Sequence, residues 1–186
     1  VTGVQTCALP IWGVAGCEAA WVAAARGHEV ILLEREDRLG GQFALAAAMP
    51  SRRELGKFLD YQEVQLSRYA VDVRIRNDAD ADTLAELAPD AVVLATGSMP
   101  VPMAFDGGVD GFTLPEALAD PSSLGDHVAV YDTIGEWSVL SVVEHLAELG
   151  KSLTVLSPVP AFSWRTTIYS TLATQGRLRE YGVRIL

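Results

Sequence analysis

Residues 13–34 have the sequence Gly-Val-Ala-Gly-Cys-Glu-Ala-Ala-Trp-Val-Ala-Ala-Ala-Arg-Gly-His-Glu-Val-Ile-Leu-Leu-Glu. The small residues from Gly13 to Gly16 open a helix whose first N–H groups lack partners, and its positive dipole end stabilises a pyrophosphate there. The apolar residues 30–33 predict a buried parallel strand, and Glu34 at its end is placed to accept hydrogen bonds from the ribose hydroxyls of an adenine dinucleotide. The stretch therefore predicts the phosphate turn, helix, strand and terminal acid of a dinucleotide-binding fold.

The glycine pattern departs from G-x-G-x-x-G at its first position, which is Ile11. The first glycine makes the tight turn out of the first strand, so a β-branched residue there is expected to strain or widen the loop. For the glycine pattern alone, a helix cap with tight packing is the alternative. The acid at the correct distance favours the dinucleotide.

Residues 1–12 occupy the place of the first strand but are predicted to be irregular, because Pro10 sits where a central strand needs its ladder N–H. The stretch through Ile11 resembles a translated sequencing-adaptor read. In that interpretation the native strand and first glycine are overwritten and Ile11 is an artefact. The alternative is a genuine irregular N-terminus.

Composition excludes several classes of function. At 186 residues and 49% hydrophobic content, the chain can form one large or two small domains. Its net charge of -10 opposes nucleic acid and anionic lipid, it has no apolar run of about 18 residues, and its N-terminus lacks the basic region of a signal peptide. Cys7 and Cys17 form no C-x-x-C, and His28, His127 and His145 are scattered, so we expect no metal site and a reducing, cytoplasmic setting.

Strands alternate with helices along the whole chain, which predicts an α/β, Rossmann-like fold of parallel sheets with helices on both faces. Expected domains are an irregular N-terminus at 1–12, a nucleotide-binding domain at 13–111 with a linker at 98–111, and an incomplete second βαβ domain at 112–186. A strand at 183–186 without an exit indicates a fragment, truncated at both ends. The expected helices are 43–48, a Ser51-capped helix to Arg68, 80–87, 136–149 and 167–181; the other expected strands are 71–75, a buried strand at 91–95, 127–131 and 153–156.

Three separated motifs agree with one another: Gly13 to Gly16 with Glu34, then Arg38-Leu39-Gly40-Gly41-Gln42, then Leu94-Ala95-Thr96-Gly97-Ser98. Together they resemble the two-dinucleotide-domain flavoproteins. More narrowly, residues 36–42 with Pro50-Ser51-Arg52-Arg53-Glu54-Leu55 resemble the C-terminal half of the 2,4-dienoyl-CoA reductase and trimethylamine dehydrogenase group of the old-yellow-enzyme superfamily. The resemblance runs from about Gly13 to Leu186. It implies an FAD-dependent oxidoreductase of the NADH:flavin oxidoreductase type, acting on an amine or an enoyl-type substrate.

The resemblance also implies a set of cofactor contacts. Backbone N–H groups of Gly13, Val14, Ala15 and Gly16 would contact the pyrophosphate, Glu34 the adenosine ribose and Arg35 the adenine side. Gly41 and Gln42 would lie along the phosphates and ribityl chain, Ala79 would flank adenine, and Ala95, Thr96 and Gly97 would approach from the third side. For the Gly40-Gly41 and Thr96-Gly97 motifs taken singly, an ordinary loop and a plain strand end are the alternatives.

In this group the second domain normally binds NAD(P)H at its own glycine turn, which here is Asp132-Thr133-Ile134-Gly135-Glu136-Trp137-Ser138. One glycine remains. Asp132 and Glu136 would place carboxylates beside a pyrophosphate, and Trp137 would fill the groove. We therefore predict that this unit does not bind NAD(P)H and resembles the amine-dehydrogenase members more than the reductases.

No residue resembles a proton-transfer catalyst. Within the resemblance, the chemistry belongs to an N-terminal barrel that carries FMN and an iron–sulfur cluster, with an electron-transfer flavoprotein as a further partner. This part would be a scaffold for FAD or for ADP in the same site. The rival hypothesis is a non-catalytic module for assembly or interaction with a lapsed site, favoured by Ile11 and the poor second turn. A pyridine-nucleotide disulfide reductase would need a redox Cys pair, which is absent.

Overall fold

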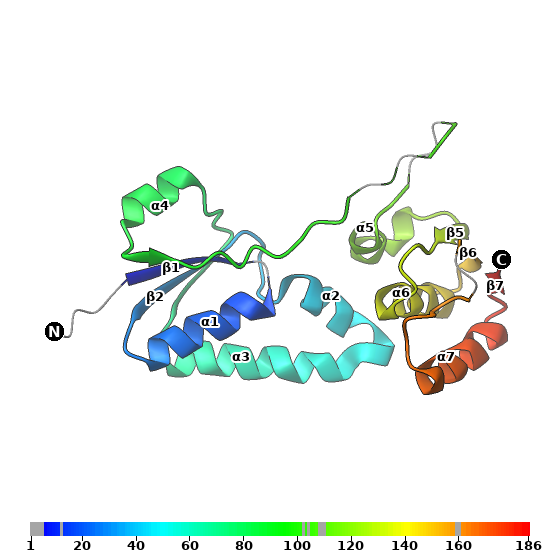
Figure 1. Cartoon of the computed structure of the whole chain (residues 1–186), viewed down its shortest axis with the longest axis horizontal. Helices are drawn as coiled ribbons and strands as arrows, with labels where there is room; N and C mark the ends of the chain where they lie inside the picture. Colours follow the sequence, from blue (N-terminus) through cyan, green and yellow to red (C-terminus); the bar gives the residue numbers. More distant parts are fainter. Residues whose placement is uncertain (1–5, 12, 102, 104, 108–110, 159–160) are drawn as a thin grey trace. The chain divides into compact units, whose positions relative to one another are not determined.

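The computed structural model describes residues 6–11, 13–101, 103, 105–107, 111–158 and 161–186, and for 6–11 it describes the backbone only. The chain divides into two compact units (Figure 1). Unit 1 comprises Val1–Ala48 and Arg53–Met99, and unit 2 comprises Met49–Arg52 and Pro100–Leu186. None of the described helices is long and apolar enough to cross a membrane.

The described part of unit 1 contains a four-stranded parallel sheet with the strand order β3-β2-β1-β4. Figure 1 shows α1 and α3 on one side of this sheet and α4 on the other. Its strands are β1 (Thr6–Ile11), β2 (Glu29–Glu34), β3 (Asp72–Ile75) and β4 (Ala91–Val92), and its helices are α1 (Val14–Ala25), α2 (Gly41–Ala48), α3 (Gly56–Arg68) and α4 (Ala81–Leu87). The short 3-10 helix η1 (Pro50–Leu55) precedes α3.

The core of unit 1 forms where α1 crosses the sheet. Cys17 and Ala20 on α1 pack with Val30, Leu32 and Leu66, all of them buried. Small residues on α1 let the helix approach the strand closely, and complete burial of a Leu side chain contributes about 1.5–3 kcal/mol. The strand predicted at 30–33 is confirmed, since β2 is buried from Val30 to Glu34.

The irregular N-terminus predicted for residues 1–12 is wrong for Thr6–Ile11, which forms β1. Thr6 pairs with Glu29 and Ile11 with Glu34, in an unbroken parallel register. Strand β4 pairs only with Cys7 and Ala8. Pro10 therefore lies beyond the doubly paired stretch, where its missing N–H costs little. Ile11 is accommodated as the last strand residue, and residues 1–5 and 12 lie outside the described ones.

Two further expectations in unit 1 are corrected. The buried strand expected at 91–95 is only β4, and Leu94 is 74% exposed. Its burial fails because β4 is the edge of the described sheet and has β1 on one side only. Ser51 does not cap α3, which begins at Gly56 with no side-chain cap on Leu55, because Pro50 starts a 3-10 turn before the α-helix.

The described part of unit 2 is a three-stranded parallel sheet in the order β5-β6-β7. Its buried core joins α6 and α7 to β6, and the buried Glu144 of α6 forms an ion pair with Arg177 of α7. Helix α5 was not predicted, although Thr113 and Glu116 form a capping box at its start. The elements are α5 (Leu114–Ala119), the 3-10 turn η2 (Pro121–Ser123), β5 (His127–Tyr131), α6 (Trp137–Glu148), β6 (Ser152–Leu156), α7 (Ile168–Glu180) and β7 (Arg184–Ile185).

The loop before α2 yields a test of packing. Gly40 has φ +103°, and a Cβ added there would lie 2.8 Å from Leu59 Cδ2. We expect Gly40→Ala to lower the free energy of unfolding by about 1–3 kcal/mol, measured by urea denaturation. Gly27→Ala is the matched control: its φ is +92°, but nothing lies within 4 Å of the added carbon. Equal losses for the two variants would contradict a packing role for Gly40.

Candidate nucleotide-binding site

In unit 1, the start of α1 and the end of β2 lie together at the carboxyl ends of the parallel strands. Ile11 is the Cα partner of Glu34, and α1 begins at Val14, just after β1. Gly13 precedes the helix without a side-chain cap, so the first N–H groups of α1 have no partner from that residue. This places an uncapped helix N-terminus beside the carboxylate, which is the arrangement a pyrophosphate and its ribose need.

The three separated motifs come together at this end of the sheet. Gly13 and Gly41 form an isolated antiparallel bridge between their backbones. A Cβ on Gly13 would lie 3.8 Å from the carbonyl oxygen of Gly40, so the two glycine turns approach closely. The side chain of Gln42 donates a hydrogen bond to the Ser98 carbonyl at 2.5 Å, which ties the second motif to the third.

Glu34 is completely buried, and its two carboxylate oxygens differ. Oε1 accepts a hydrogen bond from the Glu36 N–H at 2.9 Å, whereas Oε2 has no partner among the described residues. Burial raises the pKa of this carboxyl, chiefly by removing water from the charged form. A ribose hydroxyl that donated to Oε2 would supply the missing partner, so the residues present fit an adenosine.

The remaining predicted contacts lie around this centre. The Asn77 N–H donates to the Glu34 carbonyl at 2.9 Å, which holds the loop with the half-buried Ala79 at the same end of the sheet. Arg35 is paired with the exposed Glu36 at 3.1 Å. Ala95 packs against the core of unit 1, while the neighbouring Thr96 and Gly97 are exposed. For this third motif, the link to the site is the Gln42–Ser98 hydrogen bond.

One residue that supports the phosphate turn was not predicted. Gln62 on α3 is buried, and its Nε2 donates to the Val14 carbonyl at 2.8 Å and approaches Glu18 Oε2 at 3.4 Å. It therefore fixes the first turn of α1 from the neighbouring helix. The available signal was a polar residue on the apolar face between Leu59 and Leu66.

Cys17 lies next to the site but offers no reactive thiolate. Burial raises the pKa of its thiol to about 12, and the negative charge of Glu34 adds to the effect. The thiol is therefore neutral at physiological pH and packs as a small apolar group.

The second turn, in unit 2, differs from the first. Asp132 is buried, and its Oδ1 accepts hydrogen bonds from the backbone of the turn itself. Glu136 pairs with Arg165 at 3.0 Å. The Arg52 guanidinium lies over the ring of Trp137, 4.2 Å from the ring centroid.

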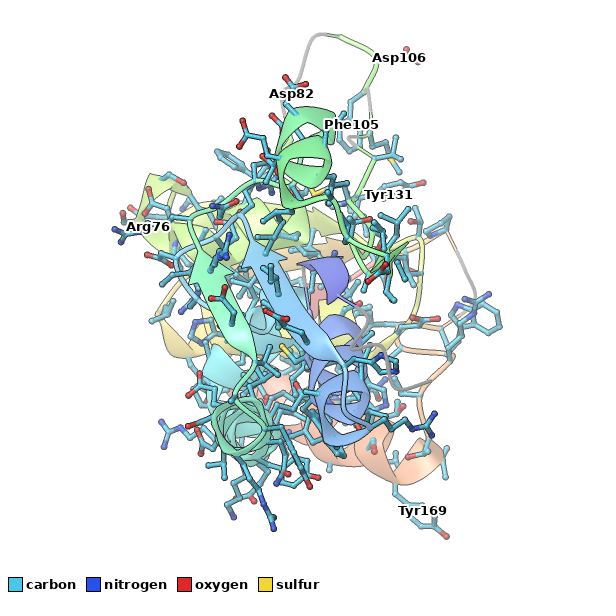
Figure 2. All side chains as sticks on the ribbon, turned by 90° about the vertical axis from the view of Figure 1, so that its left-hand side faces the viewer. Arg76, Asp82, Phe105, Asp106, Tyr131 and Tyr169 are labelled. Carbon is cyan, nitrogen blue, oxygen red and sulfur yellow. The ribbon has the colours of Figure 1, made fainter. Side chains whose placement is uncertain are left out.

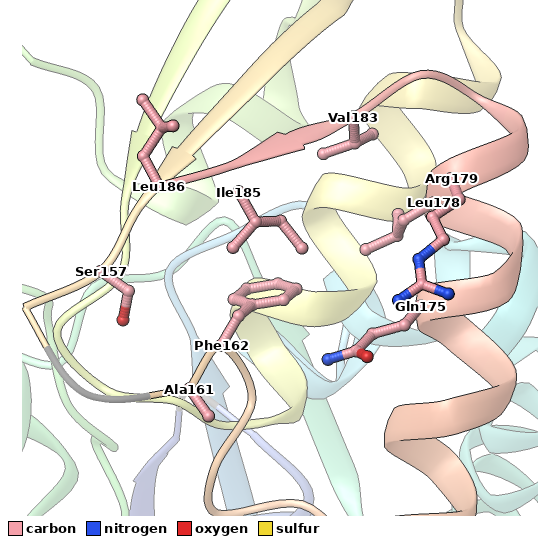
Figure 3. A pocket seen from close by; sticks show the side chains of 9 residues that line it. All are labelled: Ser157, Ala161, Phe162, Gln175, Leu178, Arg179, Val183, Ile185 and Leu186. Carbon is pink, nitrogen blue, oxygen red and sulfur yellow. The ribbon is translucent and has the colours of Figure 1, made fainter.

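A hollow in the described part of unit 2 lies apart from the predicted contacts. This hollow, of about 340 Å³, lies beside α7, with Phe162, Leu178 and Ile185 around it and Gln175 and Arg179 at its side (Figure 3). No predicted site residue lines it. Figure 2 shows Arg76 and Tyr169 projecting from the ribbon, and both are exposed.

This geometry is that of a Rossmann-like fold, and residues 13–55 match the family model of the NAD(P)-binding Rossmann-like domain. Over 153 residues the chain is 36% identical to the N,N-dimethylglycine/sarcosine dehydrogenase of Chromohalobacter salexigens, covering 78% of this chain and 22% of that protein. Over 148 residues it is 39% identical to the NADH oxidase of Thermoanaerobacter brockii, covering 77% of this chain and 23% of that protein.

Solved structures agree on the fold. A 2-naphthoyl-CoA reductase superposes with a TM-score of 0.85 at 24% identity, over 100% of this chain and 28% of that one. The histamine dehydrogenase from Rhizobium sp. 4-9 superposes with a TM-score of 0.85 at 23% identity, over 100% of this chain and 31% of that one. The chain is thus related to this group of flavoprotein oxidoreductases, and the resemblance predicted from its motifs is confirmed. It spans less than a third of the length of these relatives.

The buried carboxyl makes stability depend on pH. Because the folded pKa of Glu34 is raised above its ordinary value of 4.5, its contribution to stability is full below that value and is lost as pH rises through the folded pKa. We expect the unfolding free energy of the ligand-free protein, minus that of Glu34→Gln, to fall as pH rises from about 4.5 through the folded pKa of Glu34. Denaturant unfolding at a series of pH values measures this difference. Glu29→Gln, at the exposed start of β2, is the control. If the difference in unfolding free energy between the parent protein and Glu34→Gln is constant with pH, the raised pKa of Glu34 is refuted.

Proposed function

We propose that this chain is the adenine-dinucleotide-binding part of an FAD-dependent oxidoreductase that oxidises an amine or reduces an enoyl-type substrate. The observation that carries the proposal is the fully buried Glu34, whose Oε2 lacks a partner among the described residues, beside the uncapped start of α1. A carboxylate buried in this way is costly unless something donates to it. Binding of an adenosine ribose would offset that cost.

Several parts of unit 1 would have a role in binding. The N–H groups of residues 14–16 would hold the pyrophosphate, and Glu34 would orient the ribose through charge-assisted hydrogen bonds. The Gly13–Gly41 bridge leaves a surface without side chains, along which the diphosphate can lie. Gln42, anchored to Ser98, would follow the chain toward the flavin. FAD supplies two-electron redox chemistry when bound; ADP would use only the first half of the same site.

The substrate class rests on the relatives. They are named as a dimethylglycine/sarcosine dehydrogenase, an N-methylproline demethylase and an alkene reductase/demethylase. As the resemblance implies, we propose that the substrate site, FMN and an iron–sulfur cluster belong to an N-terminal barrel of the same protein. An electron-transfer flavoprotein is the acceptor that fits amine oxidation. The described residues of this chain would bind and orient the dinucleotide.

The rival function is a non-catalytic module for assembly or interaction. The observation that favours it is the second turn, where Asp132 occupies backbone N–H groups that a phosphate would need. The two functions differ in one property of unit 1, because a lapsed site has no reason to bind adenine nucleotides.

Titration with ADP separates them, because all the groups that ADP would contact lie among the described residues of unit 1. We expect saturable binding by calorimetry, and a dissociation constant about 10- to 150-fold higher in Glu34→Ala, which loses hydrogen bonds worth about 1.5–3 kcal/mol. Glu29→Ala removes the same charge from the exposed end of the same strand and should bind as the parent does. An unchanged constant in Glu34→Ala would overturn the ribose assignment, and no binding of ADP or FAD would favour the module.

A further inference from the structure

We infer that the phosphate turn of unit 2 is closed from within by Asp132, so that this unit does not take up a pyridine dinucleotide. The inference rests on the proposed function, since it assigns the dinucleotide of the enzyme to unit 1 alone. It concerns a residue whose buried carboxylate has no role in the proposed FAD site.

The two units repeat one βαβ pattern, which identifies equivalent positions. In unit 1, β1 leads through a turn into α1 and then to β2, with Ile11 opposite Glu34. In unit 2, β5 leads through a turn into α6 and then to β6, with Tyr131 opposite Leu156. Asp132 therefore stands where the phosphate turn begins.

Asp132 satisfies the turn that a phosphate would use. Its side chain is fully buried, and Oδ1 accepts hydrogen bonds from the N–H groups of Ile134 at 3.0 Å and Gly135 at 2.8 Å. Successive backbone N–H groups before a helix are the donors that bind phosphate oxygens in nucleotide folds. Here one carboxylate oxygen already takes the place of the phosphate oxygen.

A second segment covers the turn. Gly135 has φ +69°, and its carbonyl accepts the Arg165 N–H at 2.9 Å. A Cβ built on Gly135 would lie 2.2 Å from Trp164 Cδ1, so the indole rests directly on this glycine. The indole therefore covers the face of Gly135 from which a Cβ would project. Trp164 was not predicted from sequence, because it follows the turn by almost thirty positions.

The ribose acceptor is missing as well. Leu156 ends β6 as Glu34 ends β2, and the next residue, Ser157, donates its hydroxyl to the Asp132 carbonyl at 3.3 Å. Asp132 Oδ2 has no partner among the described residues, so its charge would repel a nearby pyrophosphate. Among its described residues, unit 2 thus offers an occupied turn, a covered glycine and no carboxylate at the end of β6. In the proposed enzyme, the flavin would take its electrons from the substrate and not from NAD(P)H bound here.

Binding is tested on the whole chain with unit 1 saturated by ADP, so that NADH or NADPH cannot be scored at the first site. The readout is quenching of tryptophan fluorescence, because the indole of Trp164 lies against Gly135 of the second turn. We expect no saturable signal up to about 1 mM of either nucleotide. Saturable binding of either one in the ADP-saturated protein would overturn the inference. A failure of ADP to bind is detected separately, in the calorimetric titration, and refutes the proposed function instead.

The closed turn itself is tested by amide hydrogen exchange. We expect the Ile134 and Gly135 amides to be protected in the parent protein and in Asp132→Asn, which keeps an acceptor, and to exchange about tenfold faster in Asp132→Ala. Asp126→Ala, an exposed residue just before β5, should leave both amides unchanged. If both amides exchange at the unprotected rate in the parent protein, the inference fails, and this comparison needs no variant to fold.

Discussion

The parallel register between β1 and β2 is the constraint on which the nucleotide site depends. Because Ile11 lies opposite Glu34, the chain that leaves β1 and the acid that ends β2 arrive at the same edge of the sheet. A register shift by one residue would send Glu34 to the other face of the strand. The small residues of α1 maintain this register, since they allow the helix to pack on β2 through Cys17 and Ala20.

The price of this arrangement is a buried charge. Most of β2 is apolar and stabilises the fold, but Glu34 is as buried as its neighbours and keeps one oxygen without a donor among the described residues. Sites that bind ligands commonly carry such local instability, because the ligand supplies what the fold leaves out. In unit 2, the buried carboxylate of Asp132 instead accepts a hydrogen bond from the backbone N–H of Gly135 in the same turn.

Sequence patterns within short stretches predicted the elements that depend on neighbouring residues. Helix α1, strand β2 and the acid at its end follow from small residues, an apolar run and a fixed spacing, and the structure reproduces them. Pro10 misled the prediction, because a proline is unfavourable in a strand only where its N–H would be paired, and pairing on both sides depends on where β4 ends. Gln62 and Trp164 were missed because each acts on a turn far away in sequence. Such contacts depend on tertiary packing, which one sequence does not contain.

Strand β4 has a consequence for how this protein meets other chains. It is paired with β1 along one side, and Val92, Val93 and Leu94 are exposed in the described part of unit 1. An apolar strand with one open edge presents a row of free N–H and C=O groups, and neither charge nor proline interrupts these three residues. Such an edge recruits a further strand, either from its own polypeptide or from a second molecule.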